Sequence, residues 1–168
     1  EMFPIESVTV GHALIGINVA SCVKARLAKS GCRIAGSPLR VRVSPSKYVV
    51  PDFLIFCGKP ELTDEFHDTI VNPKVIIEIL SPSTMNYDSA EKFRMYRSLS
   101  SFEEYILIFQ DRPRIQTFRK TADNRWALST FDGLESVAAI ESLGFAMPLA
   151  EVYDGIEEHV TERKHLEY

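Results

Sequence analysis

No apolar run in this sequence is longer than a strand, and none approaches the length that a membrane-spanning helix needs. No repeat, low-complexity tract or linker interrupts its 168 residues, a length typical of one folded domain with its own core. The formal net charge of −4 argues against a surface built for wholesale nucleic-acid binding, although it does not exclude a local basic groove. We therefore expect residues 1–168 to form a single domain with no membrane partner.

Cysteine is scarce as well. Cys22, Cys32 and Cys57 are odd in number and have no CxxC spacing, so we expect neither a disulfide scaffold nor a zinc site. The simplest interpretation is that all three are buried free thiols in a reducing compartment. The cysteines therefore predict a cytoplasmic protein.

The order of the expected elements predicts an α/β fold with a mixed sheet flanked by helices. Residues 11–29 carry apolar side chains at every fourth position and precede Gly31, a pattern typical of an amphipathic helix that stops there. A second helix is expected to begin at Asp88 and to end near Leu99. Asp88 would cap it, with Glu91 as the reciprocal partner in a capping box. The expected strands are residues 32–43, 49–56, 75–80, 104–109, 114–120 and 125–131. A short final helix is expected at residues 149–153.

Two acids interrupt strands that are otherwise apolar. Asp52 lies within residues 49–56 and Glu78 within residues 75–80, and strands this apolar usually lie in the middle of a covered sheet. An ionised acid there is strongly destabilising unless a cation, a metal or hydrogen-bond donors compensate it. Because side chains alternate along a strand, both carboxylates can share one face if the two strands are neighbours. Such oxygen ligands favour Mg²⁺ or Mn²⁺ over Zn²⁺.

The helix after Glu78 offers a cation for the same place. Lys92 and Tyr96 share a helix face with Met95 and Leu99, so a lysine heads the stripe that should rest on the sheet. Its ammonium could orient an attacking water or stabilise developing negative charge. The simpler alternatives are that Asp52 is a turn residue, that Glu78 and Lys92 form a structural ion pair, or that Lys92 extends to solvent.

Other polar residues favour a structural interpretation. His12 lies in the first turn of the first helix on its core-facing side, where a packed, hydrogen-bonded histidine is commoner than a ligand. Tyr96 is expected in the core, with its hydroxyl reaching the site. Scattered arginines favour a solvated surface over a phosphate-binding groove. These are Arg40, Arg42, Arg94, Arg97, Arg112 and Arg114.

Over roughly residues 11–156 the sequence resembles the Uma-two endonuclease family, formerly a domain of unknown function, of the PD-(D/E)XK restriction-endonuclease-like superfamily. The residues that carry the resemblance are Pro51-Asp52, Glu78-Ile79-Leu80-Ser81-Pro82-Ser83-Thr84, Asp88, Lys92, Tyr96, His12, Leu143-Gly144-Phe145 and Pro148-Leu149. One departure from the superfamily is that Leu80 stands where its lysine is expected, which the Uma-type variant places on the following helix, here at Lys92.

The resemblance implies a restriction-endonuclease-like mixed β-sheet flanked by helices and a Mg²⁺- or Mn²⁺-dependent hydrolysis of DNA. Asp52 and Glu78 would hold the metal, the Ile79 carbonyl would be a third ligand, and Lys92 would assist catalysis. The family's upstream acid is unassigned, with Glu1 as a candidate, and analogy with the superfamily suggests a homodimer. Two other functions stay open: a catalytically inactive nuclease-fold module that binds DNA or protein, and, last, a two-carboxylate glycosidase.

Overall fold

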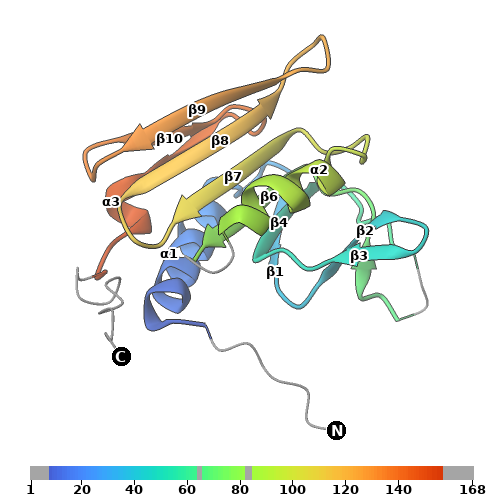
Figure 1. Cartoon of the computed structure of the whole chain (residues 1–168), viewed down its shortest axis with the longest axis horizontal. Helices are drawn as coiled ribbons and strands as arrows, with labels where there is room; N and C mark the ends of the chain where they lie inside the picture. Colours follow the sequence, from blue (N-terminus) through green and yellow to red (C-terminus); the bar gives the residue numbers. More distant parts are fainter. Residues whose placement is uncertain (1–7, 64–65, 82–84, 157–168) are drawn as a thin grey trace, which may run out of the picture.

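A six-stranded mixed sheet forms the centre of the fold (Figure 1). The computed structural model describes residues 8–63, 66–81 and 85–156. Neighbouring strands are antiparallel except β6 and β7, which run parallel because the segment between them crosses one face of the sheet. In spatial order the strands are β1 (Cys32–Gly36), β4 (Phe53–Cys57), β6 (Val75–Leu80), β7 (Glu104–Phe109), β8 (Arg114–Lys120) and β9 (Trp126–Asp132).

Helix α1 (Val10–Arg26) covers one face of this sheet. Its apolar residues Ile15, Val19 and Val23 recur every four positions, so they line one side of the helix and are fully buried against β6 and β7. Thr9 caps the helix, because its Oγ1 accepts a hydrogen bond from the His12 amide. Three further elements pack on the same face as α1: β10 (Val137–Ile140), β11 (Phe145–Pro148) and α3 (Leu149–Val152).

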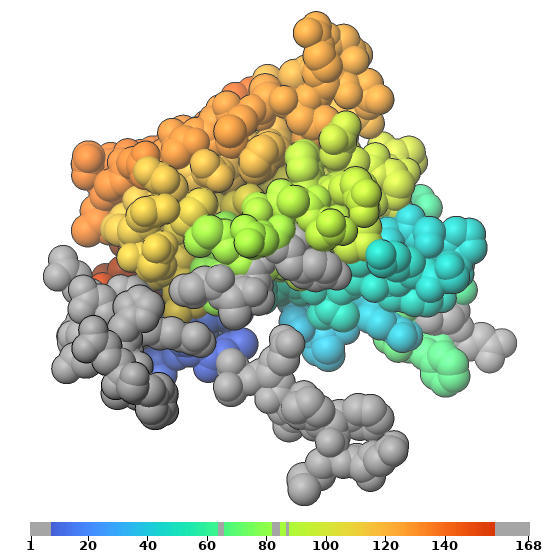
Figure 2. Space-filling view, in the orientation of Figure 1, coloured from blue at the N-terminus to red at the C-terminus, as the bar shows by residue number. Residues whose placement is uncertain are grey.

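The opposite face is covered by η1 (Tyr87–Lys92), a π-helical turn, which continues into α2 (Phe93–Tyr96). Aromatic rings fill the space beneath them: Phe93 stacks on Tyr105 with centroids 5.3 Å apart, and Phe102 and Trp126 pack at the side. In Figure 2 this helical segment lies between the β8–β9 hairpin and a smaller sheet. The lysine at the end of η1 is thereby held over the sheet.

That smaller sheet has the order β3-β2-β5, with β2 (Arg40–Ser44), β3 (Lys47–Val49) and β5 (Thr69–Ile70). Its residues Val41, Val49 and Ile70 are buried in the same core as η1 and α2. Strand β3 ends at Val49 and β4 begins at Phe53, so residues 50–52 pass directly from the small sheet to the large one. Strand β5 is not among the strands predicted from the sequence.

The predicted fold class is confirmed, since the structure is a mixed sheet with helices on both faces. The predicted strands 114–120 and 125–131 are present as the antiparallel pair β8 and β9, and the predicted short helix after Pro148 is present as α3. The predicted cap at Asp88 was wrong: Asp88 lies inside η1 and pairs with Lys92, whereas Glu91 pairs with Arg94. Glu1, the candidate for the family's upstream acid, lies outside the described residues.

The prediction of three free thiols was also wrong. Cys32 and Cys57 stand directly opposite each other on the antiparallel strands β1 and β4 and form a disulfide, while Cys22 is free and buried. The pairing depends on a register between strands that spacing in the sequence does not reveal. Within the described ranges, no helix is long and apolar enough to cross a membrane.

Candidate active site

Asp52 and Glu78 meet where β4 begins beside β6. Phe53 is paired with Ile77 in this antiparallel ladder, so the register extended by one residue places Asp52 opposite Glu78. Opposite residues of an antiparallel pair lie on the same face with their side chains close together. The strand register therefore brings the two acids to one place at the edge of the apolar core.

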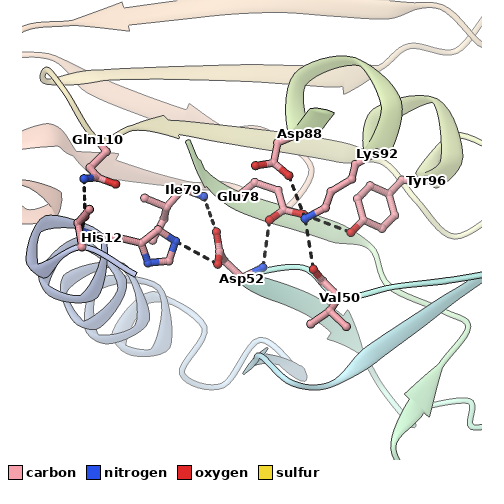
Figure 3. Close-up of polar contacts among 10 residues, drawn as sticks. His12, Val50, Asp52, Glu78, Ile79, Asp88, Lys92, Tyr96 and Gln110 are labelled. Atoms are coloured by element: carbon pink, nitrogen blue, oxygen red, sulfur yellow. Dashed lines mark hydrogen bonds and ion pairs between the residues drawn. The ribbon is translucent and has the colours of Figure 1, made fainter. Parts of the chain in front are cut away.

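The Asp52 carboxylate is held by backbone and side chain together (Figure 3). Its Oδ2 accepts a hydrogen bond of 2.7 Å from the Ile79 amide, and its Oδ1 lies 3.2 Å from Nε2 of His12. The Asp52 amide in turn donates to Oε2 of Glu78 at 3.1 Å. These contacts fix the carboxylate at the start of β4, between α1 on one face of the sheet and η1 on the other.

Pro51 shapes the backbone at the same place. The Leu80 carbonyl points toward β7, because it accepts a hydrogen bond from the Gln110 amide that follows this strand. Backbone groups of successive residues in a strand point to opposite neighbours, so the amide and carbonyl of Ile79 point toward β4. The residue opposite Ile79 in the extended register is Pro51, which has no N–H to donate to that carbonyl. Beside the Asp52 carboxylate there is consequently a backbone oxygen that Pro51 cannot pair, and it can serve as a ligand.

Glu78 is almost completely buried, with 1% of its surface exposed. Its Oε1 accepts from Lys92 Nζ at 2.9 Å and from the Tyr96 hydroxyl at 3.2 Å, whereas Oε2 faces Asp52. Burial raises the pKa of Glu78 to about 8; the charge of Lys92 opposes this rise and the charges of Asp52 and Asp88 add to it. The carboxylate is thus an acid that gains from a nearby cation.

Lys92 is the cation that the structure places there. Its Nζ contacts Oε1 of Glu78 and Oδ1 of Asp88, both at 2.9 Å, and donates to the Val50 carbonyl at 3.3 Å. Burial on its own would lower the pKa of Lys92, but the charges of Glu78 and Asp88 outweigh burial and raise it. The ammonium is therefore charged and directed at the acids, as Figure 3 shows.

Three site residues were not identified as such from the sequence. Asp88 was interpreted as a helix cap and is instead the second anion around Lys92. Gln110 follows β7 and donates from Nε2 to Oγ1 of Thr9, the cap of α1, at 2.5 Å. The contact between Thr9 and Gln110 joins residues more than a hundred positions apart, so no local pattern could reveal it. Asp88 could have been recognised from its spacing of four residues to Lys92.

The oxygen atoms at this site fit a hard divalent cation. Two carboxylates and one backbone carbonyl are the ligand types that Mg²⁺ and Mn²⁺ prefer. The Lys92 ammonium, 2.9 Å from Oε1 of Glu78, already places one positive charge beside these oxygens. Across the described parts of the chain, no three His, Cys, Asp or Glu side chains form a ready ligand cluster, so backbone oxygen and water would complete the coordination.

Three of the arginines singled out from the sequence form surface ion pairs. Arg40 pairs with Asp68, Arg94 with Glu91 and Arg114 with Asp132. All of these pairs are at least partly exposed, as expected for a solvated surface. These three pairs agree with the interpretation of the arginines as surface residues.

Comparisons with known proteins give a consistent result. The Uma2 family, described as "Putative restriction endonuclease", matches residues 1–150. Two uncharacterised proteins of Synechocystis sp. strain PCC 6803 are 28% identical over 134 residues and 25% identical over 147 residues. The first alignment covers 79% of this chain and 76% of the relative, and the second covers 86% and 75%.

A solved structure also resembles this fold. The crystal structure of a nuclease of the DUF820 group from Anabaena variabilis, described there as putative, superposes with a TM-score of 0.69 over 91% of this chain and 84% of that chain. Its sequence identity is 16%, so the likeness shows the fold alone. The fold is therefore nuclease-like, with Asp52, Glu78 and Lys92 gathered at one end of β6.

Proposed function

Because the chain belongs to the Uma2 family of restriction-endonuclease-like proteins, we propose that it is an endonuclease that uses Mg²⁺ or Mn²⁺ to hydrolyse phosphodiester bonds in DNA. One observation carries the proposal: Lys92 Nζ contacts Oε1 of Glu78, while Oε2 of the same carboxylate accepts from the Asp52 amide. Two acids and an amine at the end of a buried strand are the groups that metal-assisted phosphodiester hydrolysis needs.

Asp52, Glu78 and the Ile79 carbonyl would hold the cation. When bound, such a cation polarises a phosphate oxygen and lowers the pKa of a coordinated water. The amide of Ile79 fixes one Asp52 oxygen and the Tyr96 hydroxyl fixes one Glu78 oxygen. Each carboxylate thus keeps one oxygen for orientation and has one that can turn to a ligand.

Lys92 would be the catalytic cation of the protein itself. Asp88 contacts the same ammonium at 2.9 Å, so Lys92 keeps a partner when Glu78 turns toward a metal. There it can orient the attacking water or stabilise the negative charge that develops on the phosphate in the transition state. The raised pKa of Lys92 keeps it protonated for that purpose.

Incubation of purified protein with supercoiled and single-stranded DNA, with Mn²⁺ or Mg²⁺, tests the proposal. We expect nicking or cleavage by the wild type and its loss in Glu78→Ala. Glu104→Gln is a matched control, because Glu104 is equally buried but lies away from the site, and it should keep its activity. A folded wild type that never cuts, or a Glu78→Ala protein that cuts equally well, would argue against the proposal.

The second candidate function is a catalytically inactive module that binds DNA or protein. The observation that favours it is that Lys92 already forms ion pairs with both Glu78 and Asp88, as in a purely structural ion-pair cluster. Calorimetric titration with Mn²⁺ and Mg²⁺ separates the two functions. A nuclease binds cation with the wild type and not with folded Asp52→Ala or Glu78→Ala proteins, whereas the inactive module gives identical titrations for all three.

We also propose that residues 1–168 act as one domain and as a homodimer. The cysteines do not support a location in the cytoplasm, because Cys32 and Cys57 form a disulfide, a bond that is rare in reducing compartments. The helix α1 supports a dimer, because Val10, Leu14 and Ile17 expose an apolar stripe along its outer side. Light scattering of the wild type and of Ile17→Glu tests the assembly. A monomeric wild type would contradict the dimer and leave the proposed chemistry unaffected.

A further inference from the structure

We propose that Nε2 of His12 is a ligand of the same cation, so that the site is a mixed nitrogen and oxygen site. An imidazole ligand favours transition metals such as Mn²⁺, Fe²⁺ or Co²⁺ over Mg²⁺, which prefers oxygen. The inference rests on the proposed function, since it concerns the metal of that function. It identifies the class of cation that the site selects.

The separation of two atoms is the first support. Nε2 of His12 lies 3.2 Å from Oδ1 of Asp52. Adjacent ligands of an octahedral ion with bonds of about 2.1 Å lie about 3.0 Å apart, so these two atoms already have the spacing of neighbouring ligands. The other oxygen of Asp52 is held by the Ile79 amide, which directs Oδ1 toward the imidazole.

Contacts of Thr9 hold the backbone of His12 in place at the start of α1, as expected for a residue that supplies a ligand. Its amide donates to Oγ1 of Thr9, and the Ala13 amide donates to the Thr9 carbonyl. From the end of β7, Nε2 of Gln110 then donates to Oγ1 of Thr9. The first turn of α1 is thereby tied to the central sheet beside β6, and a ligand held by supporting contacts of this kind is preorganised for metal binding.

Gln110 supplies an independent observation. It is 4% exposed, and its Oε1 is buried without a hydrogen-bond partner in the part of the chain that the structure describes. Buried polar atoms are nearly always paired, so this oxygen is an acceptor open to one more donor, as Oε1 of Glu104 also is; it is compatible with a bound water or ligand and does not by itself indicate one. In Figure 3 this oxygen is on the side of the amide that faces Ile79. A water on the cation can donate to it.

Glu78 remains compatible with such a site. Its Oε1 is occupied by Lys92 and Tyr96, but Oε2 faces Asp52. The cation would thus bind Oδ1 of Asp52, Nε2 of His12 and, after a turn of the carboxylate, Oε2 of Glu78. If His12 were only a hydrogen-bond partner of Asp52, it would orient the acid without touching the metal.

Pulsed electron paramagnetic resonance on Mn²⁺-loaded protein distinguishes these two roles. We expect a nitrogen coupling from a directly bound imidazole in the wild type, and its loss in His12→Gln. His67→Gln is the control, because His67 is an exposed histidine in the loop before β5, and it should keep the signal. Calorimetry should show Mn²⁺ affinity reduced by about tenfold or more in His12→Gln.

A further variant tests the metal preference. His12→Asp replaces the nitrogen by oxygen, so the ratio of Mn²⁺ to Mg²⁺ affinity should fall relative to the wild type. Mn²⁺ binding that depends on Glu78 but shows no nitrogen coupling would overturn the inference and leave the proposed function standing. Absence of cation binding by the folded wild type would instead remove the proposed function and this inference with it.

Discussion

Glu78 and Glu104 lie on the adjacent parallel strands β6 and β7, and both are buried, yet their surroundings differ in kind. Glu104 pairs with Val75 in the register, so it lies at the opposite end of the strands and on the α1 face. Its Oε2 accepts from the amide and the hydroxyl of Ser142, and no ion pair is made by Glu104 within the described chain. Glu78 instead faces an ammonium.

The comparison shows that burial of an acid does not by itself identify a functional site. Burial raises the pKa of both glutamates, and in Glu104 the Ser142 hydrogen bonds oppose the rise. Glu104 holds the turn between β10 and β11, where Ser142 lies, against the sheet. What distinguishes Glu78 is a second acid, a lysine, and a backbone carbonyl opposite a proline.

Removal of Lys92 should have the largest effect on stability. Without its ammonium, Glu78 and Asp88 lose their common partner, so Lys92→Met should lower the free energy of unfolding by about 3 kcal/mol in chelator. Lys74→Met is the matched control, because the Lys74–Glu103 pair is more exposed and should contribute at most about 1 kcal/mol. Urea unfolding measures both.

The same variant sharpens the comparison when Mn²⁺ is added. A cation that binds Glu78 can replace the missing positive charge, so Mn²⁺ should restore part of the lost stability in Lys92→Met. If Lys92→Met and Lys74→Met lowered the free energy of unfolding equally, Glu78 would depend on its cation no more than the partly exposed Glu103 does. A deficit that Mn²⁺ does not reduce would favour the inactive module.

The pH dependence of the metal-free protein gives a second, smaller test. The pKa of Glu78 is about 8 in the folded state against 4.5 for the ordinary group, so the folded state binds more protons than the unfolded state between those values. The contribution of Glu78 to the free energy of unfolding should therefore be largest below pH 4.5, decrease as the pH rises from 4.5, and be lost above pH 8. Glu104 contributes in the same direction.

Unfolding of Glu78→Gln and Glu104→Gln at several pH values separates the two contributions. Each substitution should flatten the decline, and Glu78→Gln should flatten it more. A decline that stays unchanged in both variants would show that neither acid carries a raised pKa. A larger change in Glu104→Gln would invert the comparison, because it would make the acid without a cation the more strongly perturbed one.

The sequence revealed the parts of this site whose signal is local. Asp52 and Glu78 stand out because each interrupts an apolar strand, and Lys92 because it heads a helical stripe. Glu104 carries the same kind of signal, but it begins its strand and so resembles a boundary residue. The helices and the β8–β9 hairpin were predictable for the same reason, since their periodicity is contained in short segments.

Features that depend on tertiary register were not predictable. The bond between Cys32 and Cys57 needs β1 beside β4 in one particular alignment. The contact of Gln110 with Thr9 needs the end of β7 beside the start of α1. Asp88 was misinterpreted for a different reason, because a cap and a member of an ion-pair cluster have the same local sequence, and the π-helical turn decided between them.

The smallest predicted effect concerns the hydroxyl of Tyr96, which donates to Oε1 of Glu78 inside the core. Tyr96→Phe removes one hydrogen bond to a buried acid without changing the packing of the ring, so it should cost about 1 kcal/mol of unfolding free energy. Tyr48→Phe, at an exposed tyrosine of β3, should change nothing measurable. Because Glu78 then loses a donor to its charged form, its pKa should rise further, and the decline of stability with pH should extend to higher pH. An unchanged pH profile in Tyr96→Phe would mean that the hydroxyl does not influence the charge state of Glu78, which would then be set by burial and by the charges of Lys92, Asp52 and Asp88.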